Sequence, residues 1–222
     1  MKFLNFKLRI TLRSTLISFI IRTLPKFKKR VMQNLSLIYP SMTELDKKNF
    51  FKIFSNNLGL TFTEFLFNEE YQKLQKIKFD KNSEIKEIKQ AVKSNRPVLI
   101  VSGHIGPWEA VRALLKRNGI ETAAIYRKSK NKFYQPYHHK TIEAGGKPIF
   151  QVGRRGTTEM IKYLKKGGVV CMMIDQAISD GRYINFLGVP AKTSFAIANL
   201  ALKYNALIIP AYAVRNLTEE PV

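Results

Sequence analysis

The sequence has 222 residues, 45% of them hydrophobic, which is enough for one sizeable core or for one large domain with an appendage. Its 38 Lys and Arg against 16 Asp and Glu give a formal net charge of +22. Such a charge implies an anionic partner: nucleic acid, an acidic membrane surface, or an acidic carrier or substrate. The single cysteine, Cys171, excludes an internal disulfide, and its apolar neighbours indicate a packed thiol and not a nucleophile.

The first segment of the chain is both basic and apolar. Residues 1–43 contain nine basic residues and no acidic one, interleaved with Phe, Leu and Ile. The longest uncharged stretch, from Ser14 to Ile21, is far shorter than the roughly 20 apolar residues that span a bilayer. A nucleic-acid-binding arm usually carries more polar residues, so nucleic acid is not an expected partner. We therefore expect residues 1–24 to form a helix on an anionic membrane surface, the alternative being an amphipathic helix packed on its own domain.

The following residues are also expected to be helical. A second helix is predicted near 29–39, and a third begins at Thr43 or a neighbour, with Glu44 and Asp46 in its first turn. Four large apolar residues recur in it at helical spacing, which is more typical of core than of a cofactor site: Phe50, Phe54, Leu58 and Phe65. These features predict a helical N-terminal region over residues 1–95, with residues 1–24 as its membrane anchor.

The pattern changes after about residue 95. Short apolar runs alternate with helical segments, which predicts an α/β domain over residues 96–222 with a mixed, mostly parallel sheet flanked by helices. The expected strands are 98–102, 122–126, 147–150, 169–174 and 207–213. The expected helices lie near 107–118, 132–144, 156–166 and 193–204.

The stretch "VLIVSGHIGPWEAVRALLKRNG", residues 98–119, places a histidine on the turn that leaves the first expected strand. Catalytic sites in α/β sheets favour this carboxyl edge. Glu109 falls in the first turn of the next helix, close enough to accept a hydrogen bond from one ring nitrogen of His104 and to leave the other free as a general base. Glu109 also has a purely structural interpretation, because the helix dipole favours a carboxylate in a first turn.

Four blocks in order carry a family resemblance: "SGHIGPWE", "IYRKSKN" at 125–131, "MMIDQAIS" at 172–179, and "INFLGVPAKTSFAIANLALKYNALIIPAY" at 184–212. From about residue 95 to 215 the chain resembles the lipid A biosynthesis acyltransferases of the lauroyl/myristoyl type, a branch of the lysophospholipid acyltransferase superfamily. Two departures stand out. The Phe-Phe-Gly element of the family is Phe-Leu-Gly here, and the chain is expected to be short at its C-terminus relative to the family.

The resemblance implies transfer of a fatty acyl group from an acyl carrier protein or coenzyme A thioester to a hydroxyl of a lipid A precursor or related glycolipid. His104 would act as general base and Glu109 would orient its ring. No covalent acyl-enzyme, metal or cofactor is implied. The partners implied are the acyl donor, an anionic glycolipid acceptor and an anionic membrane surface. The implied location is the cytoplasmic face of the bacterial inner membrane, with peripheral or monotopic attachment.

Substrate-binding candidates lie downstream of the histidine. Residues 125–155 contain eight Lys and Arg and one acidic residue, and within them Arg127 is the candidate for acceptor phosphate or for the developing oxyanion, with Asn131 beside it. Arg154 belongs to "GRRGTTEM", a plausible anion nest before a helix. Asp175 and Gln176 end an expected strand and either shape the site or form a structural turn.

One alternative function stays open at the sequence level. A non-catalytic basic protein that binds anionic membrane lipid or nucleic acid would have the same charge. It would not explain a histidine and a carboxylate on a strand-to-helix loop followed by ordered family blocks. His138 and His139 are adjacent, but the sequence offers no Cys, His and carboxylate set with metal-ligand spacing.

Overall fold

The computed structural model describes residues 5–74, 76–81, 83–176 and 181–215. Contacts divide the chain into two compact units. The helical unit contains residues up to Leu66, together with residues 183–191 and Arg215. The α/β unit contains the described parts of 67–182 and 192–214. The expected division at residue 95 differs from this one, because residues 67–95 include a helix that packs into the core of the sheet.

The helical unit contains α1 (Phe6–Thr23), α2 (Pro25–Ile38) and α3 (Glu44–Leu66). The Asn5 side chain caps α1 by accepting a hydrogen bond from the Leu8 amide at 2.8 Å. Pro25 begins α2, where its missing N–H costs no hydrogen bond. The Thr43 hydroxyl accepts from the Asp46 amide at 3.1 Å and caps α3, as the sequence predicts.

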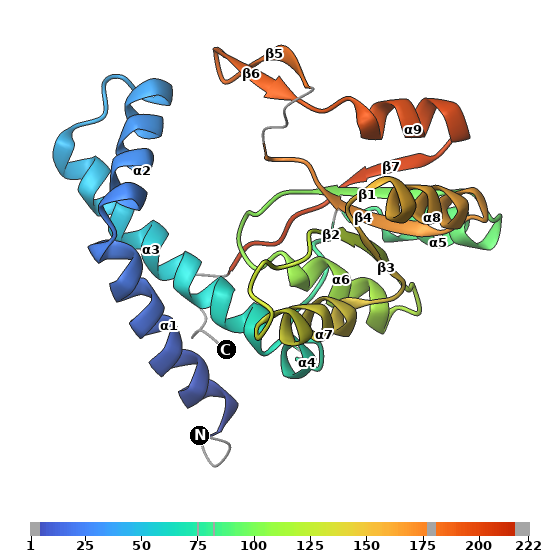
Figure 1. The fold of residues 1–222 in the computed structure, drawn as a ribbon, viewed down its shortest axis with the longest axis horizontal. Helices are drawn as coiled ribbons and strands as arrows, with labels where there is room; N and C mark the ends of the chain where they lie inside the picture. The colour runs from blue at the N-terminus through green and yellow to red at the C-terminus, as the bar shows by residue number, and fades with distance from the viewer. Residues whose placement is uncertain (1–4, 75, 82, 177–180, 216–222) are drawn as a thin grey trace. The chain divides into compact units, whose positions relative to one another are not determined.

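Small residues form the contact between α1 and α3, which lie side by side in Figure 1. A Cβ on Gly59 of α3 would come within 2.6 Å of the Ser14 carbonyl oxygen, so only glycine permits this approach. The Ser18 hydroxyl of α1 donates to Asn56 Oδ1 of α3 at 2.7 Å. We call this contact the α1–α3 seam; its buried small residues are Ser14, Ser18, Ser55 and Gly59.

The opposite side of α1 exposes large apolar side chains. Residues two positions apart on an α-helix point in nearly opposite directions, since each residue turns the helix by about 100°. The buried face of α1 follows residues 10, 14, 18 and 21. The exposed apolar stripe, shifted by two positions, consists of Leu8, Leu12, Leu16, Phe19 and Ile20. No helix in the described part of the chain is long and apolar enough to cross a membrane.

The α/β unit is built on a five-stranded parallel sheet in the order β3-β2-β4-β1-β7. Its strands are β1 (Val98–Ser102), β2 (Ala123–Tyr126), β3 (Ile149–Gln151), β4 (Val169–Met173) and β7 (Leu207–Pro210). The central strands are runs of Val, Leu, Ile, Cys and Met, as strands buried on both faces require. All five strands were expected, and the parallel sheet confirms the predicted fold class.

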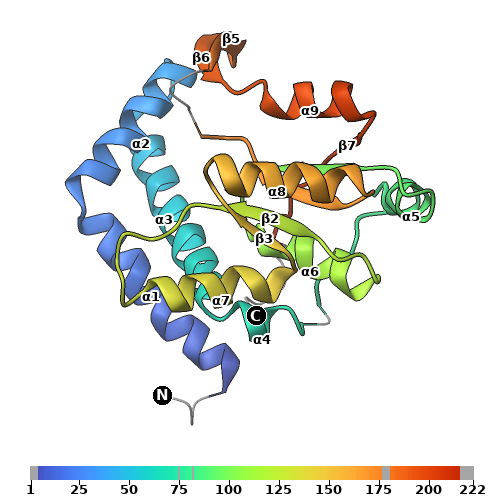
Figure 2. The same cartoon turned by 45° about the vertical axis from the view of Figure 1, so that its right-hand side comes forward.

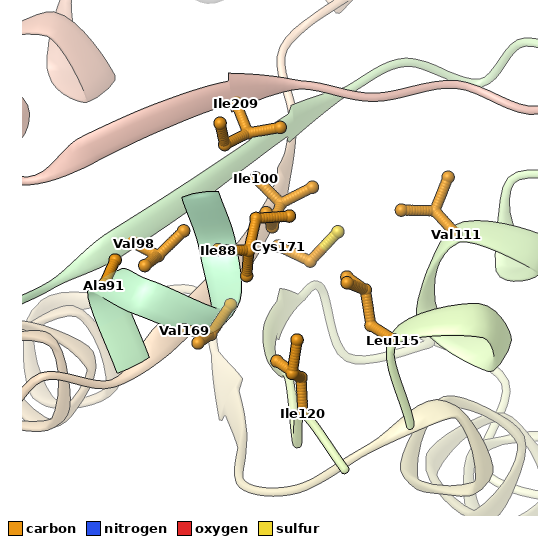
Figure 3. Close-up of a cluster of buried hydrophobic side chains, with 10 residues drawn as sticks. All are labelled: Ile88, Ala91, Val98, Ile100, Val111, Leu115, Ile120, Val169, Cys171 and Ile209. Atoms are coloured by element: carbon orange, nitrogen blue, oxygen red, sulfur yellow. The ribbon is translucent and has the colours of Figure 1, made fainter. Parts of the chain in front are cut away.

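Helices cover both faces of this sheet (Figures 1 and 2). On one face, α5 (Ile85–Lys93) and α6 (Glu109–Arg117) pack on β1, β4 and β7 in the core cluster of Figure 3. On the other face, α8 (Arg154–Lys165) and α9 (Ala196–Tyr204) pack on β1 and β4 around Leu99, Val170 and Leu164. The short α4 (Asn68–Tyr71) contacts α7 (Gln135–Gly145), which in turn contacts α6.

A two-stranded ribbon, β5 (Arg182–Phe186) and β6 (Val189–Thr193), was not expected from the sequence. Its two-residue turn has Leu187 at φ 54° and Gly188 at φ 80°, the conformation of a type I′ hairpin. These strands escape a search for apolar runs because β5 is exposed along its whole length. The helix expected from 193 begins at Ala196, after the ribbon ends.

Candidate active site

The carboxyl edge of β1 and β4 is a switch point of the sheet. After β1 the chain crosses one face through α6 to reach β2, and after β4 it crosses the other face through α9 to reach β7. The two loops therefore leave neighbouring strands toward opposite faces, the topology at which α/β sheets bind their ligands. His104 lies on the loop after β1 and Asp175 on the loop after β4, so both stand at this point.

The carboxylate of Asp175 holds His104 through two hydrogen bonds. Oδ1 lies 2.9 Å from Nδ1 of the imidazole, and Oδ2 accepts from the backbone amide of His104 at 2.8 Å. Both side chains stay accessible, at 40% for the imidazole and 35% for the carboxylate. Asp175 was expected to bind substrate or to form a turn, and the structure shows it as the partner of the histidine.

The protonation of this pair follows from its hydrogen bonds. Partial burial by itself raises the pKa of Asp175, but hydrogen bonds from the His104 amide and ring, together with charge attraction, outweigh burial and lower that pKa. The carboxylate is therefore ionised at neutral pH and has no proton to donate. In the neutral form of the imidazole, the proton shared with the carboxylate belongs on Nδ1, and Nε2 is then the ring nitrogen with a free lone pair.

Two further residues shape the histidine loop. The ring of Trp108 meets the imidazole edge-on, with centroids 5.3 Å apart and planes at 71°. Gly106 has φ 54°, and a Cβ there would lie 2.4 Å from the Ala213 carbonyl oxygen, so the tight turn before α6 needs glycine. Trp108 was not among the expected site residues, although the quoted stretch places it between the two that were.

Glu109 has different partners from those expected. Its Oε2 accepts from Asn68 Nδ2 at 2.8 Å and lies 3.5 Å from Arg112 Nη1. The prediction that Glu109 contacts the His104 ring is therefore wrong in this structure. The reason is direction: the first turn of α6 points the Glu109 side chain at α4 and α7, while His104 turns toward the loop after β4. A catalytic role for Glu109 stays a prediction.

The guanidinium of Arg112 organises a buried polar cluster around Glu109. It donates to the carbonyl oxygens of Ile142 and Gly146, both at 3.0 Å, and so ties α6 to the end of α7. Asn68 joins the cluster by donating to the Thr141 carbonyl oxygen at 2.8 Å. We call Asn68, Glu109 and Arg112 the Glu109 cluster. Nothing in the sequence spacing indicates it, because its members come together only through the packing of three helices.

The other predicted binding residues lie in separate settings. Arg127 directly follows β2, the strand that lies next to β4 in the sheet. It is exposed and has no ion-pair partner among the described residues. The carboxamide oxygen of Asn131 accepts from the amides of Phe133 and Tyr134 at 2.9 and 3.2 Å, so it stabilises a turn. Arg154 is the exposed first residue of α8. Gln176 is exposed next to Asp175.

The described residues contain no group of three or more His, Cys, Asp or Glu side chains arranged to hold a metal ion. His138 and His139 lie on α7, with their rings edge-on to Tyr126. Burial raises the pKa of the Cys171 thiol to about 11, so it is protonated at neutral pH within the core of Figure 3. Cys171 therefore offers no alternative to His104 as the reactive group, and the non-catalytic role expected of His138 and His139 stays a prediction.

Comparison with known proteins finds a family model that matches this chain. The family model described as bacterial lipid A biosynthesis acyltransferase matches residues 2–220, nearly the whole chain. No curated protein matches the chain. The family match confirms the resemblance seen in the sequence and favours an enzyme over a non-catalytic basic protein.

Proposed function

The chain belongs to the bacterial lipid A biosynthesis acyltransferases, and we propose that it transfers a fatty acyl group from a thioester to a hydroxyl of a lipid A precursor or related glycolipid. The donor in this proposal is acyl carrier protein or coenzyme A. The observation that carries the proposal is the ionised Asp175 on Nδ1 of His104, which leaves Nε2 as a base at an accessible sheet edge. A nitrogen base at an accessible sheet edge can remove the proton of an alcohol and so activate its oxygen as a nucleophile.

The chemistry proceeds without a covalent acyl-enzyme. Nε2 of His104 takes the proton of the acceptor hydroxyl as the oxygen attacks the thioester carbonyl carbon. The tetrahedral intermediate then collapses, the ester C–O bond is complete, and the C–S bond breaks. The proton on Nε2 passes to the leaving sulfur, which restores the neutral imidazole.

The acceptor is anionic, and the residues after β2 provide cations to bind it. Arg127 is exposed and carries its charge at any physiological pH. Exposed lysines follow at 128, 130 and 132, and there is no acidic residue between Arg127 and Glu143. We assign Arg127 to acceptor phosphate, since a guanidinium binds phosphate through two parallel hydrogen bonds. Arg154 and Gln176 remain candidates of the same kind on neighbouring loops.

We further propose that α1 attaches the protein peripherally to the cytoplasmic face of the bacterial inner membrane. The exposed apolar stripe of α1 lies opposite the α1–α3 seam, so the packing of the helical unit does not require it. Lys26, Lys28, Lys29 and Arg30 are exposed on α2, the helix that follows α1 in the chain. An apolar stripe flanked by cations is typical of helices that lie in the interface of an anionic bilayer.

The test is acyl transfer by the purified protein, with acyl carrier protein thioester or acyl coenzyme A as donor, a lipid A precursor as acceptor, and mass spectrometry of the product. We expect His104→Ala to lower the rate on the order of a hundredfold or more, because it removes the base. His139→Ala is the matched control and should retain the wild-type rate. An unchanged rate in His104→Ala would overturn the assignment of the base, and no product from the wild-type protein with either donor would overturn the proposed reaction.

A further inference from the structure

The most exposed large apolar side chain among the described residues belongs to the α/β unit. Phe133 is 90% exposed and lies in the segment that joins β2 to α7 (Figure 2). Tyr137, four positions later in the first turn of α7, is 71% exposed. We call residues 128–134 the Phe133 loop. Exposing two aromatic rings to water costs free energy that burial against a partner would recover.

Hydrogen bonds hold the Phe133 loop in a closed turn. Asn131 Oδ1 accepts from the amides of Phe133 and Tyr134, and the Gln135 side chain accepts from the Ser129 amide at 2.6 Å. The Gln135 amide donates to the Asn131 carbonyl oxygen at 3.0 Å and so joins the turn to α7. The outward position of Phe133 therefore follows from the backbone of the turn.

Two pairs of rings leave this turn in different directions. The rings of Tyr134 and His138, four positions apart, are in contact with centroids 5.5 Å apart, and both side chains are half-buried. The His138 amide donates to the Tyr134 carbonyl oxygen at 2.9 Å, which is the bond of a helical turn. By the same spacing Phe133 and Tyr137 project together from one side, and that side is exposed.

The charges around the rings indicate the partner. Lys128, Lys130 and Lys132 are exposed in the loop, and no acidic residue lies between Arg127 and Glu143. Lysine is depleted at protein–protein interfaces, whereas anionic lipid headgroups attract it. Aromatic side chains are typical of segments that lie at the level of the headgroups.

We propose that the Phe133 loop is a membrane contact of the α/β unit. The rings of Phe133 and Tyr137 enter the headgroup region of an anionic bilayer, and the three lysines of the loop bind its phosphates. This contact goes beyond the proposed function, because it belongs to a different unit from α1 and does not depend on acyl transfer.

The full-length protein can be labelled at this loop. Cys171 is buried and the pKa of its thiol is raised to about 11, so Phe133→Cys introduces the one reactive thiol of the chain. An NBD fluorophore on that thiol should brighten and shift to the blue with phosphatidylglycerol vesicles, and nitroxide-labelled lipid should quench it. Leu202→Cys, on α9 at a position 85% exposed, is the matched control, and its label should stay in water.

Affinity for the same vesicles gives a second measurement. Phe133→Ala should weaken co-sedimentation about tenfold and leave the urea unfolding transition in place, because the ring is exposed in the absence of lipid. Lys130→Gln should weaken binding about fivefold at low salt and make the remainder less sensitive to salt. Lys203→Gln removes the same charge on α9 and should change binding less.

The outcomes separate this contact from the other proposals. An unchanged NBD signal at position 133, while the protein sediments with the vesicles, would overturn the loop contact and leave attachment through α1 standing. A response to acyl carrier protein but not to vesicles would also overturn it and make the loop a docking surface for an acidic protein. Absence of any vesicle binding would overturn both membrane contacts. Absence of acyl product would overturn the proposed function alone, since transfer does not enter these measurements.

Discussion

In the α/β unit the interior strand β1 buries residues 98–100 completely between two layers of helices, whereas in the helical unit the face of α1 that packs on α3 carries Ser14 and Ser18. Ile10 and Ile21 are buried on that face as well, but five large apolar residues of α1 lie on its other side, where Leu16 is 58% and Phe19 63% exposed. The first unit follows the rule for proteins in water, with apolar residues inside. The second departs from this rule on α1, whose exposed side is apolar and whose buried side includes two serines.

This difference shows that different interactions stabilise the two units. Burial of Val, Leu and Ile stabilises the sheet and its helices through the hydrophobic effect. The α1–α3 seam buries little apolar surface at its small positions and gains close backbone contact instead, as helices do where their surroundings are lipid. The comparison supports our proposal that the outer face of α1 contacts a membrane, and the following variants test it from the largest expected effect to the smallest.

The largest loss of stability should come from Glu109→Ala in the α/β unit. This change leaves the buried guanidinium of Arg112 without its counter-charge and removes the acceptor of the Asn68 hydrogen bond. Breaking a buried ion pair in this way costs about 3–5 kcal/mol. The measurement is urea unfolding followed by the fluorescence of Trp108, the one tryptophan of the chain, which precedes Glu109.

Glu109→Gln is the matched control for this prediction. The glutamine oxygen can still accept the Asn68 hydrogen bond, so less stability should be lost than in Glu109→Ala. If both variants are as stable as the wild-type protein but lose acyl transfer, the structural role of Glu109 is contradicted. Glu109 would then be a catalytic residue, as the sequence suggested.

A smaller effect, confined to the other unit, is expected of Gly59→Leu. The added side chain cannot fit where a Cβ alone would reach the Ser14 carbonyl oxygen, so α1 must move away from α3. Overpacking of this kind typically costs about 1–3 kcal/mol. Limited proteolysis should cut α1 sooner than in the wild-type protein, while the Trp108 unfolding transition stays in place. Leu60→Ala, a change at the neighbouring position of α3, is the control, and equal proteolysis of both variants would show that the seam does not depend on Gly59.

The sheet could be predicted from apolar runs in the sequence, but the contacts of the site could not. The five strands of the sheet coincide with short apolar runs in the sequence, a signal strong enough to locate them within a few positions. His104 and Asp175 were both identified as site residues, but their pairing depends on β4 lying next to β1, and strand order is not written in any local pattern. The spacing of His104 and Glu109 predicted a contact because it ignores the direction of the side chain on α6.

In the helical unit, too, composition predicted the type of element but not its contacts. The excess of cations and large apolar residues predicted a surface helix, and that signal survives in the exposed stripe of α1. Which face would be buried could not be predicted, because the seam uses Ser14 and Ser18, which resemble solvent-exposed residues in a sequence. Only the partner glycine on α3 makes that face the tightly packed one.

The smallest effect on stability, and the sharpest test of the comparison, is expected of Leu16→Ala. This side chain is 58% exposed on the stripe of α1, so its truncation should change the free energy of unfolding by no more than about 0.5 kcal/mol. If the stripe is buried in lipid, the same truncation removes apolar area from the membrane contact and should weaken binding to vesicles containing phosphatidylglycerol about tenfold. Leu202→Ala, at a position of α9 that is 85% exposed, is the matched control in the α/β unit and should bind these vesicles like the wild-type protein. Co-sedimentation measures both, and phosphatidylcholine vesicles, which lack the anionic charge, should retain less of every variant. Equal binding of Leu16→Ala and Leu202→Ala would mean that the apolar side of α1 does not contact the membrane.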